Sequence, residues 1–149
     1  MALKTNKSSR GGLISKLAYL DSSALIAFLD RSDSYFPIFS LAFTNPPKLV
    51  TTSLVITETH GWFLKRYDRY RATKFLQFIE TLPDLEVLPI GKQELKQGAG
   101  IIEEFKDQDL TMVDAVGLWI IRARKLRICW STDRHLSLTK AQLLIHINK

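Results

Sequence analysis

The sequence predicts a three-layer α/β/α sandwich with a mainly parallel sheet of about five strands. Short apolar runs alternate along the chain with longer segments of helical periodicity. Strands separated by helices of this length need crossover connections, which place the strands parallel to one another between two layers of helices. With 149 residues, 46% of them hydrophobic, the chain can bury one sizeable core and has no room for a second domain.

The first half of the chain is expected to contain three strands. Its elements in order are a strand over 17–21, a serine-capped helix over 22–29, a short helix over 34–43, a strand over 49–52, a helix over 53–67 capped by Ser53, a helix over 71–82 and a strand over 85–90. Asn45-Pro46-Pro47 ends the second helix, because proline lacks the N–H that would continue it. Pro89 predicts an edge position for the third strand for the same reason.

The second half is expected to add two strands. Its elements in order are a helix over 92–106 interrupted by Gly98 and Gly100, a helix to about Lys125, a strand over 127–132, a helical turn over 135–141 and a short strand over 143–147. Thr111 and Asp114 have the spacing of a capping box and mark the start of the second of these helices. Residues 1–16 are basic and contain no acid, so a flexible tail is expected to precede a single domain over 17–149.

Charge and cysteine content narrow the functional class. The formal net charge of +6, with a sequence pI near 9.6, is moderate, so the placement of the cations matters more than their number. Cys129 is the one cysteine and cannot form an internal disulfide; its place in a strand pattern indicates a buried, inert thiol. No apolar run reaches the length of a membrane span. These features favour a reducing, cytoplasmic setting and no membrane partner.

Four acidic residues lie in apolar or hydroxyl-rich settings. Asp21 and Asp133 each follow a predicted buried strand, whereas Glu58 and Asp114 lie near the starts of predicted helices. Ligands of an open parallel sheet collect beyond the carboxyl ends of its strands, so the four side chains can meet in one crevice. Converging carboxylates near a core are costly unless something compensates them. Oxygen ligands without a cluster of His or Cys favour Mg²⁺ or Mn²⁺ over zinc.

Each acid also has an ordinary structural interpretation. Asp21 could be a helix N-cap, and Asp114 could be a capping acid that interacts with the helix dipole. Glu58 is harder to explain in this way, because it lies about a turn inside a helix rich in apolar residues. His60 and His135 are interpreted as structural or surface groups, since isolated histidines near a site seldom act in catalysis. The functional inference therefore depends on the four acids occurring together.

Two internal clusters of basic residues stand out, over 65–74 and over 122–127. Either cluster could be an ordinary solvated helix face. Because both flank acids that could hold a metal ion, they favour a phosphate-bearing substrate.

Four segments together resemble the PIN-domain family of metal-dependent ribonucleases, whose bacterial members include VapC-type toxins. They are YLDSSALIAFLD around Asp21, VTTSLVITETHGWFLKR around Glu58, DQDLTMVDAVGLWIIRAR around Asp114 and WSTDRHLSL around Asp133. The resemblance covers roughly residues 17–147. One departure is Leu136, where similar sequences often have an aromatic residue; it concerns packing and not the acids.

The resemblance implies the roles of several residues. The metal and catalytic residues would be Asp21, Glu58, Asp114 and Asp133, with Ser22, Ser23 and Thr132 as polar neighbours. The implied activity is a Mg²⁺- or Mn²⁺-dependent endoribonuclease, the toxin of a type II toxin-antitoxin pair. The RNA-binding candidates are Lys65, Arg66, Arg69, Arg122, Arg124 and Arg134.

The resemblance also implies protein partners, namely a second copy of the chain in a homodimer and an antitoxin. Five aromatic residues of the first two helices are the candidate surface for these contacts, unless they pack on the sheet of their own chain: Phe28, Tyr35, Phe36, Phe39 and Phe43.

Other functional classes remain as alternatives. A non-catalytic RNA-binding or interaction domain could keep the fold, although four carboxylates without metal would not help it to bind a polyanion. An RNA-processing nuclease outside a toxin-antitoxin pair is a second alternative. A receiver-like domain or a haloacid-dehalogenase-like phosphatase needs further acids near Asp21, where Ser22 and Ser23 stand instead.

Overall fold

A computed structural model of the chain describes residues 17–147 and confirms the predicted α/β/α sandwich. The strands are β1 (Ala18–Leu20), β2 (Leu49–Thr52), β3 (Leu85–Leu88), β4 (Ile128–Trp130) and β5 (Gln142–Leu143). The helices are α1 (Ser22–Leu29), α2 (Phe36–Ala42), α3 (Ser53–Arg66), α4 (Arg69–Thr81), α5 (Lys92–Glu104) and α6 (Met112–Ala123), with short 3-10 helices η1 (Arg134–Ser137) and η2 (Leu144–His146). The basic tail predicted over 1–16 lies outside the described residues.

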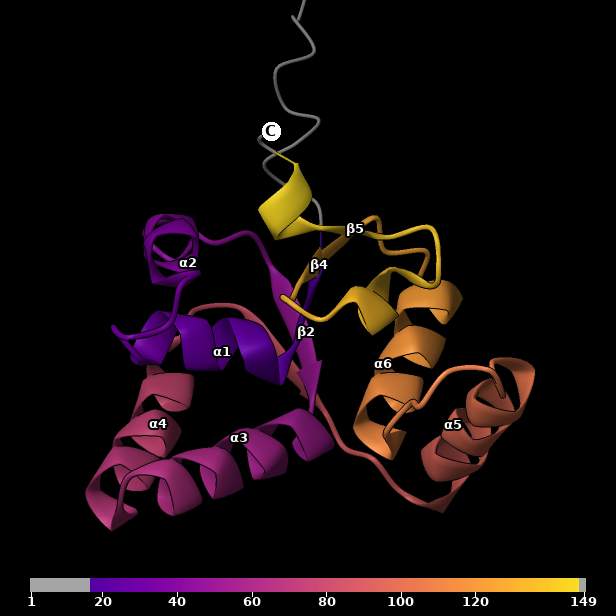
Figure 1. Cartoon of the computed structure of the whole chain (residues 1–149), viewed down its shortest axis with the longest axis horizontal. Coiled ribbons are helices and arrows are strands. Elements are labelled where there is room, and N and C mark those ends of the chain that lie inside the picture. Colours follow the sequence, from indigo (N-terminus) through magenta and orange to yellow (C-terminus); the bar gives the residue numbers. More distant parts are fainter. Residues whose placement is uncertain (1–16, 148–149) are drawn as a thin grey trace, which may run out of the picture.

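All neighbouring strands of the sheet are parallel, in the order β3-β2-β1-β4-β5. Helices α1 to α4 lie on one side of the sheet, and α5 and α6 lie on the other (Figure 1). The chain winds outward from β1 through β2 to β3 and then returns to add β4 on the other side of β1. The strand order therefore reverses between β1 and β4, and such a switch point opens a crevice beyond the carboxyl ends of the two strands.

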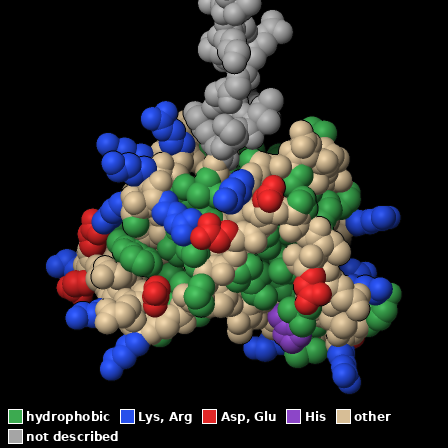
Figure 2. All heavy atoms as spheres, turned by 180° about the vertical axis from the view of Figure 1, so that it is seen from behind, with side chains coloured by type: hydrophobic (Ala, Val, Ile, Leu, Met, Phe, Trp, Pro, Cys, Tyr) green, Lys and Arg blue, Asp and Glu red, His purple; other side chains and the backbone are tan. Residues whose placement is uncertain are grey.

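The surface carries charged side chains of both signs with hydrophobic groups between them (Figure 2). Within residues 17–147, no helix is both long enough and apolar enough to cross a membrane. The most exposed large apolar side chain is Leu41 on α2, 74% exposed. Tyr35 and Ile38 are exposed near it, at 37% and 40%.

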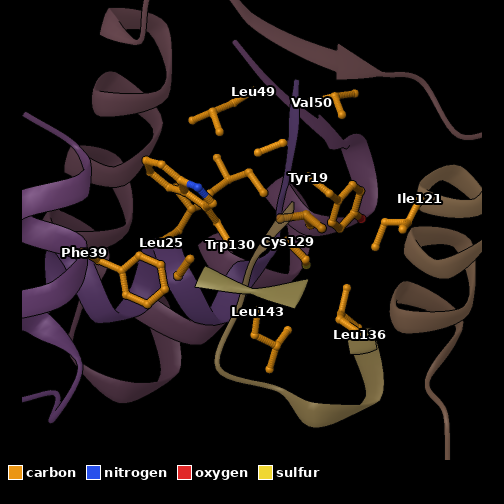
Figure 3. Close-up of a cluster of buried hydrophobic side chains, with 14 of the residues drawn as sticks. Tyr19, Leu25, Phe39, Leu49, Val50, Ile121, Cys129, Trp130, Leu136 and Leu143 are labelled. Atoms are coloured by element: carbon orange, nitrogen blue, oxygen red, sulfur yellow. The ribbon is translucent and has the colours of Figure 1, made fainter. Parts of the chain in front are cut away.

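The core lies on both faces of the sheet (Figure 3). Tyr19 is in register with Cys129, and Leu20 with Trp130. Because side chains alternate between the faces of a sheet, Tyr19 and Cys129 share the face covered by α6. Trp130 is on the opposite face, where its ring lies 4.9 Å from that of Phe43. Burial raises the pKa of the Cys129 thiol, as expected for an inert buried cysteine.

The aromatic residues of the first two helices divide between core and surface. The rings of Phe28 and Phe43 contact each other in a tilted arrangement with centroids 4.4 Å apart, and Phe39 is fully buried. Tyr35 remains exposed. Most of this group therefore packs within its own chain.

The structure corrects the predicted caps and ends of several elements. Thr52, not Ser53, caps α3, because its hydroxyl accepts from the N–H of Val55 while the Ser53 hydroxyl accepts from Ile90. Helix α4 begins at Arg69, two residues earlier than predicted, because the Asp68 side chain caps it. The strands β3, β4 and β5 are shorter than predicted, and β3 is an edge strand as Pro89 indicated.

The predicted interruption of α5 by glycine was also wrong. Helix α5 runs unbroken through Gly98, which is buried against α6. A Cβ at this position would lie 2.7 Å from the Met112 sulfur and 2.8 Å from the Val116 Cγ2. Gly98 therefore allows α5 to pack closely on α6 instead of ending the helix.

Candidate functional site

The four acids predicted from the sequence converge at the carboxyl edge of the sheet. Asp21 directly follows β1, and Asp133 lies three residues after β4, so these two acids flank the switch point. Glu58 is in the second turn of α3, which starts where β2 ends, and Asp114 is in the first turn of α6. After burial, the charges of Asp21 and Asp133 contribute to the raised pKa values of Glu58 and Asp114, so both of these acids lie within electrostatic range of the switch point.

Asp21 is buried and held by serine hydroxyls. It occupies the N-cap position of α1, yet its side chain makes no capping hydrogen bond. Instead its Oδ2 accepts from Ser131 Oγ at 2.8 Å and from Ser23 Oγ at 2.9 Å. Burial raises the pKa of Asp21, the hydroxyls lower it in part, and the charge of Asp133 raises it further. Asp21 is thus the N-cap residue by position, but its carboxylate does not cap the helix and is oriented by the serines that follow β1 and β4.

The same serines shape the turn that carries Asp133. Ser131 is fully buried, and its Oγ accepts from the N–H of Asp133 at 2.9 Å. Ser23 Oγ accepts from the N–H of Thr132, also at 2.9 Å. Two hydroxyl groups thus connect the carboxylate of Asp21 to the backbone that positions Asp133. Thr132 takes part through its backbone N–H and not through its hydroxyl.

Asp133 also contacts a histidine. Its Oδ1 accepts from the N–H of His135 at 2.9 Å and lies 3.1 Å from His135 Nδ1. Asp114, Asp133 and His135 offer ligand atoms that all lie within 4.8 Å of one another. Groups this close can bind one cation.

Asp114 caps its own helix and also has a raised pKa. Its N–H donates to Thr111 Oγ1 at 3.1 Å and its carboxylate accepts from the N–H of Thr111 at 3.4 Å, so the predicted capping box forms. Burial, followed by the charges of Asp133 and Asp21, nevertheless raises the pKa of Asp114 to about 6. Capping at a helix N-terminus favours the ionised form, so burial and, after it, the neighbouring acids outweigh the effect of the cap on this pKa.

Glu58 forms the outer part of the site. The residue as a whole is exposed, but its carboxylate is turned toward the site, where its Oε2 accepts from Ser22 Oγ at 2.7 Å. Burial of the carboxylate by its surroundings and the charges of Asp21 and Asp133 raise the pKa of Glu58, while the Ser22 hydroxyl lowers it. Ser22 and Ser23 therefore have separate tasks, the first toward Glu58 and the second toward Asp21.

Two residues of this site were not among the predicted site residues. Ser131 was missed because it was read as the continuation of a strand, although a serine that ends an apolar strand next to Thr132 and Asp133 was a usable signal. His135 was interpreted as a structural or surface group. Its proximity to Asp133 depends on the 3-10 helix η1, which the sequence placed one residue too late.

The predicted basic residues are distributed over several places. Lys65 is seven positions after Glu58 on α3 and so lies on the same face, roughly 10 Å along the helix. The Arg66 guanidinium lies 5.5 Å from the ring centroid of Tyr67, and Arg69 begins α4. Arg134 is exposed next to Asp133.

Arg122 and Arg124 lie elsewhere, at the C-terminal end of α6, and each forms an ion pair with a carboxylate. Arg122 makes two hydrogen bonds with Glu104, at 2.7 and 3.0 Å, and Arg124 makes two with Glu86, at 2.8 and 2.9 Å. Their helix runs away from the carboxyl edge, so these two side chains are at the edge opposite the acids.

Comparison with known proteins agrees with this site. The sequence profile of the family described as PIN domain matches residues 18–141. The chain belongs to the PIN domain family. Proteins of this family are nucleases, and an acid-lined crevice at the switch point of a parallel sheet fits that chemistry. No curated protein sequence matches the chain.

Solved structures of toxins have the same fold. The VapC20 toxin of Mycobacterium tuberculosis, described as cleaving the sarcin-ricin loop, is 15% identical with a TM-score of 0.73, over 82% of this chain and 93% of its own. A toxin-antitoxin complex from Klebsiella pneumoniae is 16% identical (TM-score 0.60, 85% and 97%). VapBC2 from Rickettsia felis, bound to a DNA fragment from its promoter, is 12% identical (0.57, 85% and 96%). At these identities the likeness shows a shared PIN fold.

Proposed function

We propose that this PIN domain is a metal-dependent endoribonuclease and the toxin of a toxin-antitoxin pair. The observation that carries the proposal is the convergence of Asp21, Glu58, Asp114 and Asp133 at one edge of the sheet. The pKa values of the first three are raised, by burial first and by neighbouring acids second. Close carboxylates of this kind are stabilised by a bound cation, because its charge offsets their repulsion.

The residues present fit Mg²⁺ or Mn²⁺. The donors are carboxylate oxygens from four separate elements, with hydroxyl groups behind them, and oxygen donors are those that hard divalent cations prefer. Asp21 and Asp114 are the proposed central ligands, and Asp133 and Glu58 would complete the site directly or through water. Such an ion, when bound, lowers the pKa of a coordinated water and offsets charge on the scissile phosphate.

The protein groups supply orientation and proton acceptance. The two serine hydroxyls on Asp21 Oδ2 keep that carboxylate in one orientation, which reduces the reorganisation needed during the reaction. Glu58 is the exposed acid of the four, and its raised pKa makes it the candidate to accept the proton of the attacking water at its carboxylate. His135 contacts Asp133 through its backbone N–H and lies 3.1 Å from it through Nδ1, so it helps to orient that carboxylate.

The proposal is tested by incubating the purified protein with total RNA in Mg²⁺, in Mn²⁺ and in EDTA. We expect discrete RNA fragments in the presence of either ion and intact RNA in EDTA. Binding of RNA without cleavage under any of these conditions would favour the non-catalytic RNA-binding domain. Cleavage that persists in EDTA would overturn the metal dependence.

The toxin role rests on the kinds of proteins that share the fold, two of which are toxin-antitoxin assemblies. We expect a small neighbouring gene to encode an antitoxin that co-purifies with the chain and inhibits cleavage. The exposed face of α2, with Tyr35, Ile38 and Leu41, is the proposed site of a homodimer or antitoxin contact. Light scattering over a range of concentrations tests the dimer. An isolated gene and uninhibited cleavage would instead favour RNA processing.

A further inference from the structure

A hollow lined by basic residues lies at the edge of the sheet opposite the acids. Its volume is about 710 Å³. The apolar side chains of Ile121, Leu126 and Leu138 line it together with the cations Arg122, Lys125, Arg127 and Lys140. None of its lining residues is acidic, although Arg122 is paired with Glu104. Figure 2 shows Lys and Arg side chains gathered at the upper left of the face seen from behind, where α6 ends, with hydrophobic side chains beside them.

The end of α6 builds this hollow. The N–H of Leu126 donates to the carbonyl of Ile121 at 2.9 Å, and the N–H of Lys125 donates to that of Arg122 at 3.1 Å. This pair of bonds is a Schellman motif, which brings Leu126 back over Ile121 to form an apolar floor. The left-handed position of the motif usually holds glycine, yet here it holds Lys125 with φ 53°. The ammonium group of Lys125 is therefore presented at the hollow from a backbone conformation that disfavours a side chain.

The attraction between cations and a helix C-terminus accounts for only part of this arrangement. That attraction falls off within the last turn of a helix, so it can explain Lys125. Arg127 follows the helix, and Lys140 comes from the loop between η1 and β5. No carboxylate within residues 17–147 is in ion-pair distance of Lys125, Arg127 or Lys140, in contrast to the neighbouring Arg122 and Arg124. Three unpaired cations around one hollow repel one another until an anion binds between them.

Two segments connect the hollow to the acids. Helix α6 carries Asp114 at one end and is followed by Lys125, roughly 16 Å away at the helical rise. The segment 134–140 begins beside Asp133 with Arg134 and ends at the hollow with Lys140, and no acid lies between. Arg134, Ser137 and Lys140 are exposed along this segment, so a strand that enters the acidic site can follow it toward the hollow.

We propose that the basic hollow binds the phosphate backbone of an RNA strand whose scissile bond is at the acidic site. This inference rests on the proposed function, since it names a second contact for the same substrate. The apolar floor provides a surface for a ribose or a base, and the three cations surround the phosphates. The continuity with the acidic site favours RNA over an acidic peptide as the occupant.

The experiment compares two triple variants in an Asp114→Asn background, which we expect to bind RNA with little cleavage. One variant is Lys125→Gly/Arg127→Gln/Lys140→Gln, in which glycine preserves the left-handed turn. The matched control removes the same number of charges from exposed positions on and just after α5: Lys92→Gln/Lys96→Gln/Lys106→Gln. Binding of a fluorescent single-stranded RNA is measured by anisotropy at several salt concentrations, with circular dichroism to verify folding.

We expect the hollow variant to bind RNA about tenfold or more weakly in 0.1 M salt and to reduce the slope of log Kd against log salt by about 2, the value for three lost phosphate contacts on a single strand. The α5 control should leave both quantities nearly unchanged. Equal slopes for the two variants would overturn the inference. So would normal RNA binding combined with loss of binding to a polyglutamate peptide, a result that would assign the hollow to a protein partner.

Failure of this inference is separable from failure of the proposed function. If the chain with its four acids intact cleaves RNA with metal and the hollow variant binds RNA normally, only the hollow is wrongly assigned. If that chain neither cleaves nor binds RNA, the nuclease proposal itself fails and takes this inference with it.

Discussion

The two edges of the sheet carry charges of opposite sign in different surroundings, buried at one edge and solvated at the other. At the carboxyl edge, Asp21 is buried and two serine hydroxyls orient it, so a charge is held in place at a cost to folding. At the amino edge, Lys125 and Arg127 are exposed and solvated. Solvated charges cost little but hold no fixed geometry. The first edge is suited to positioning reacting groups, and the second to attracting a charged chain.

Helix α6 joins the two edges, because it begins with Asp114 and is followed by Lys125. The packing of α6 on the sheet depends on Gly117, which lies against the fully buried ring of Tyr19. Substitutions at the start, middle and end of α6 should therefore affect activity, stability and strain respectively.

The largest effect is expected from removing an acid. Asp21→Asn or Asp114→Asn should reduce metal-dependent RNA cleavage by roughly 10²–10³-fold or more, since the charge that holds the ion is lost. In metal-free buffer the same variants should melt at a higher temperature, because repulsion between the acids is relieved. The control is Asp107→Asn, an exposed acid between α5 and α6, which should cleave within about twofold of the unmodified protein. Full activity of either site variant would remove that residue from the mechanism.

The next effect is expected in the middle of α6. Gly117→Ala should destabilise the fold by about 3 kcal/mol, because its Cβ would lie 2.8 Å from the Tyr19 hydroxyl oxygen and 3.0 Å from Cζ of the same ring. The measurement is urea unfolding. Gly100→Ala on α5 is the control: a Cβ there meets nothing within 4 Å, so alanine should stabilise the protein by about 0.5–1 kcal/mol.

A second substitution sharpens this test. The Tyr19 hydroxyl has no hydrogen-bond partner within residues 17–147, so Tyr19→Phe alone should have little effect on stability. Combined with Gly117→Ala it should recover part of the lost stability, since it removes the nearest of the clashing atoms. Additive effects of the two substitutions would show that the contact between Tyr19 and α6 is not the cause.

The alternation of periods in the sequence was sufficient to predict the layers and the parallel sheet. It was also sufficient to name the acids at the switch point, because a residue that follows a buried strand must lie at the carboxyl edge. It was insufficient for Gly98 and Gly117. Glycine in a helix is disfavoured by local propensity, and only the packing of α5 on α6, or of α6 on Tyr19, explains its presence.

The sequence was also insufficient for the partners of the charged groups. Arg122 and Arg124 belong to the same run of cations as Arg127, yet Glu104 and Glu86 occupy the first two. These acids are 18 and 38 positions away in the chain. Which cation stays free depends on tertiary contacts that spacing does not encode. The same holds for Ser131, whose hydroxyl becomes important only because β1 and β4 are neighbours.

A smaller effect is expected from pH. The folded pKa of Asp114, about 6, is above its unfolded value near 3.8, so between these values the folded state binds more protons than the unfolded state. In metal-free buffer, stability should therefore fall as pH rises from about 4 to about 6, by roughly 1–2 kcal/mol after allowance for partial exposure. Melting curves in EDTA between pH 4.5 and 7.5 measure this change.

The variant Asp114→Asn isolates the contribution of this acid to the pH dependence. Carboxylates with lowered pKa values, such as Asp30, act in the opposite direction, but their effect is lost mainly below pH 4. The variant should show a flatter dependence above that pH. Parallel curves for the variant and the unmodified protein would mean that neither burial nor the neighbouring acids raise the pKa of Asp114.

The smallest effect is expected at the amino edge. Lys125→Gly should stabilise the protein by about 1 kcal/mol, because a φ of 53° has no steric cost for glycine and is disfavoured for a residue with a Cβ. Ala123→Gly, two positions earlier in the last helical turn, should have the opposite sign and cost up to about 1 kcal/mol. The free energies of unfolding of both variants are measured by urea denaturation. If Lys125→Gly instead destabilises the protein, the lysine stem contributes packing at the hollow that outweighs the backbone strain. If it stabilises the protein and weakens RNA binding, Lys125 is retained at a cost to stability, which a solvated cation without a ligand would not require.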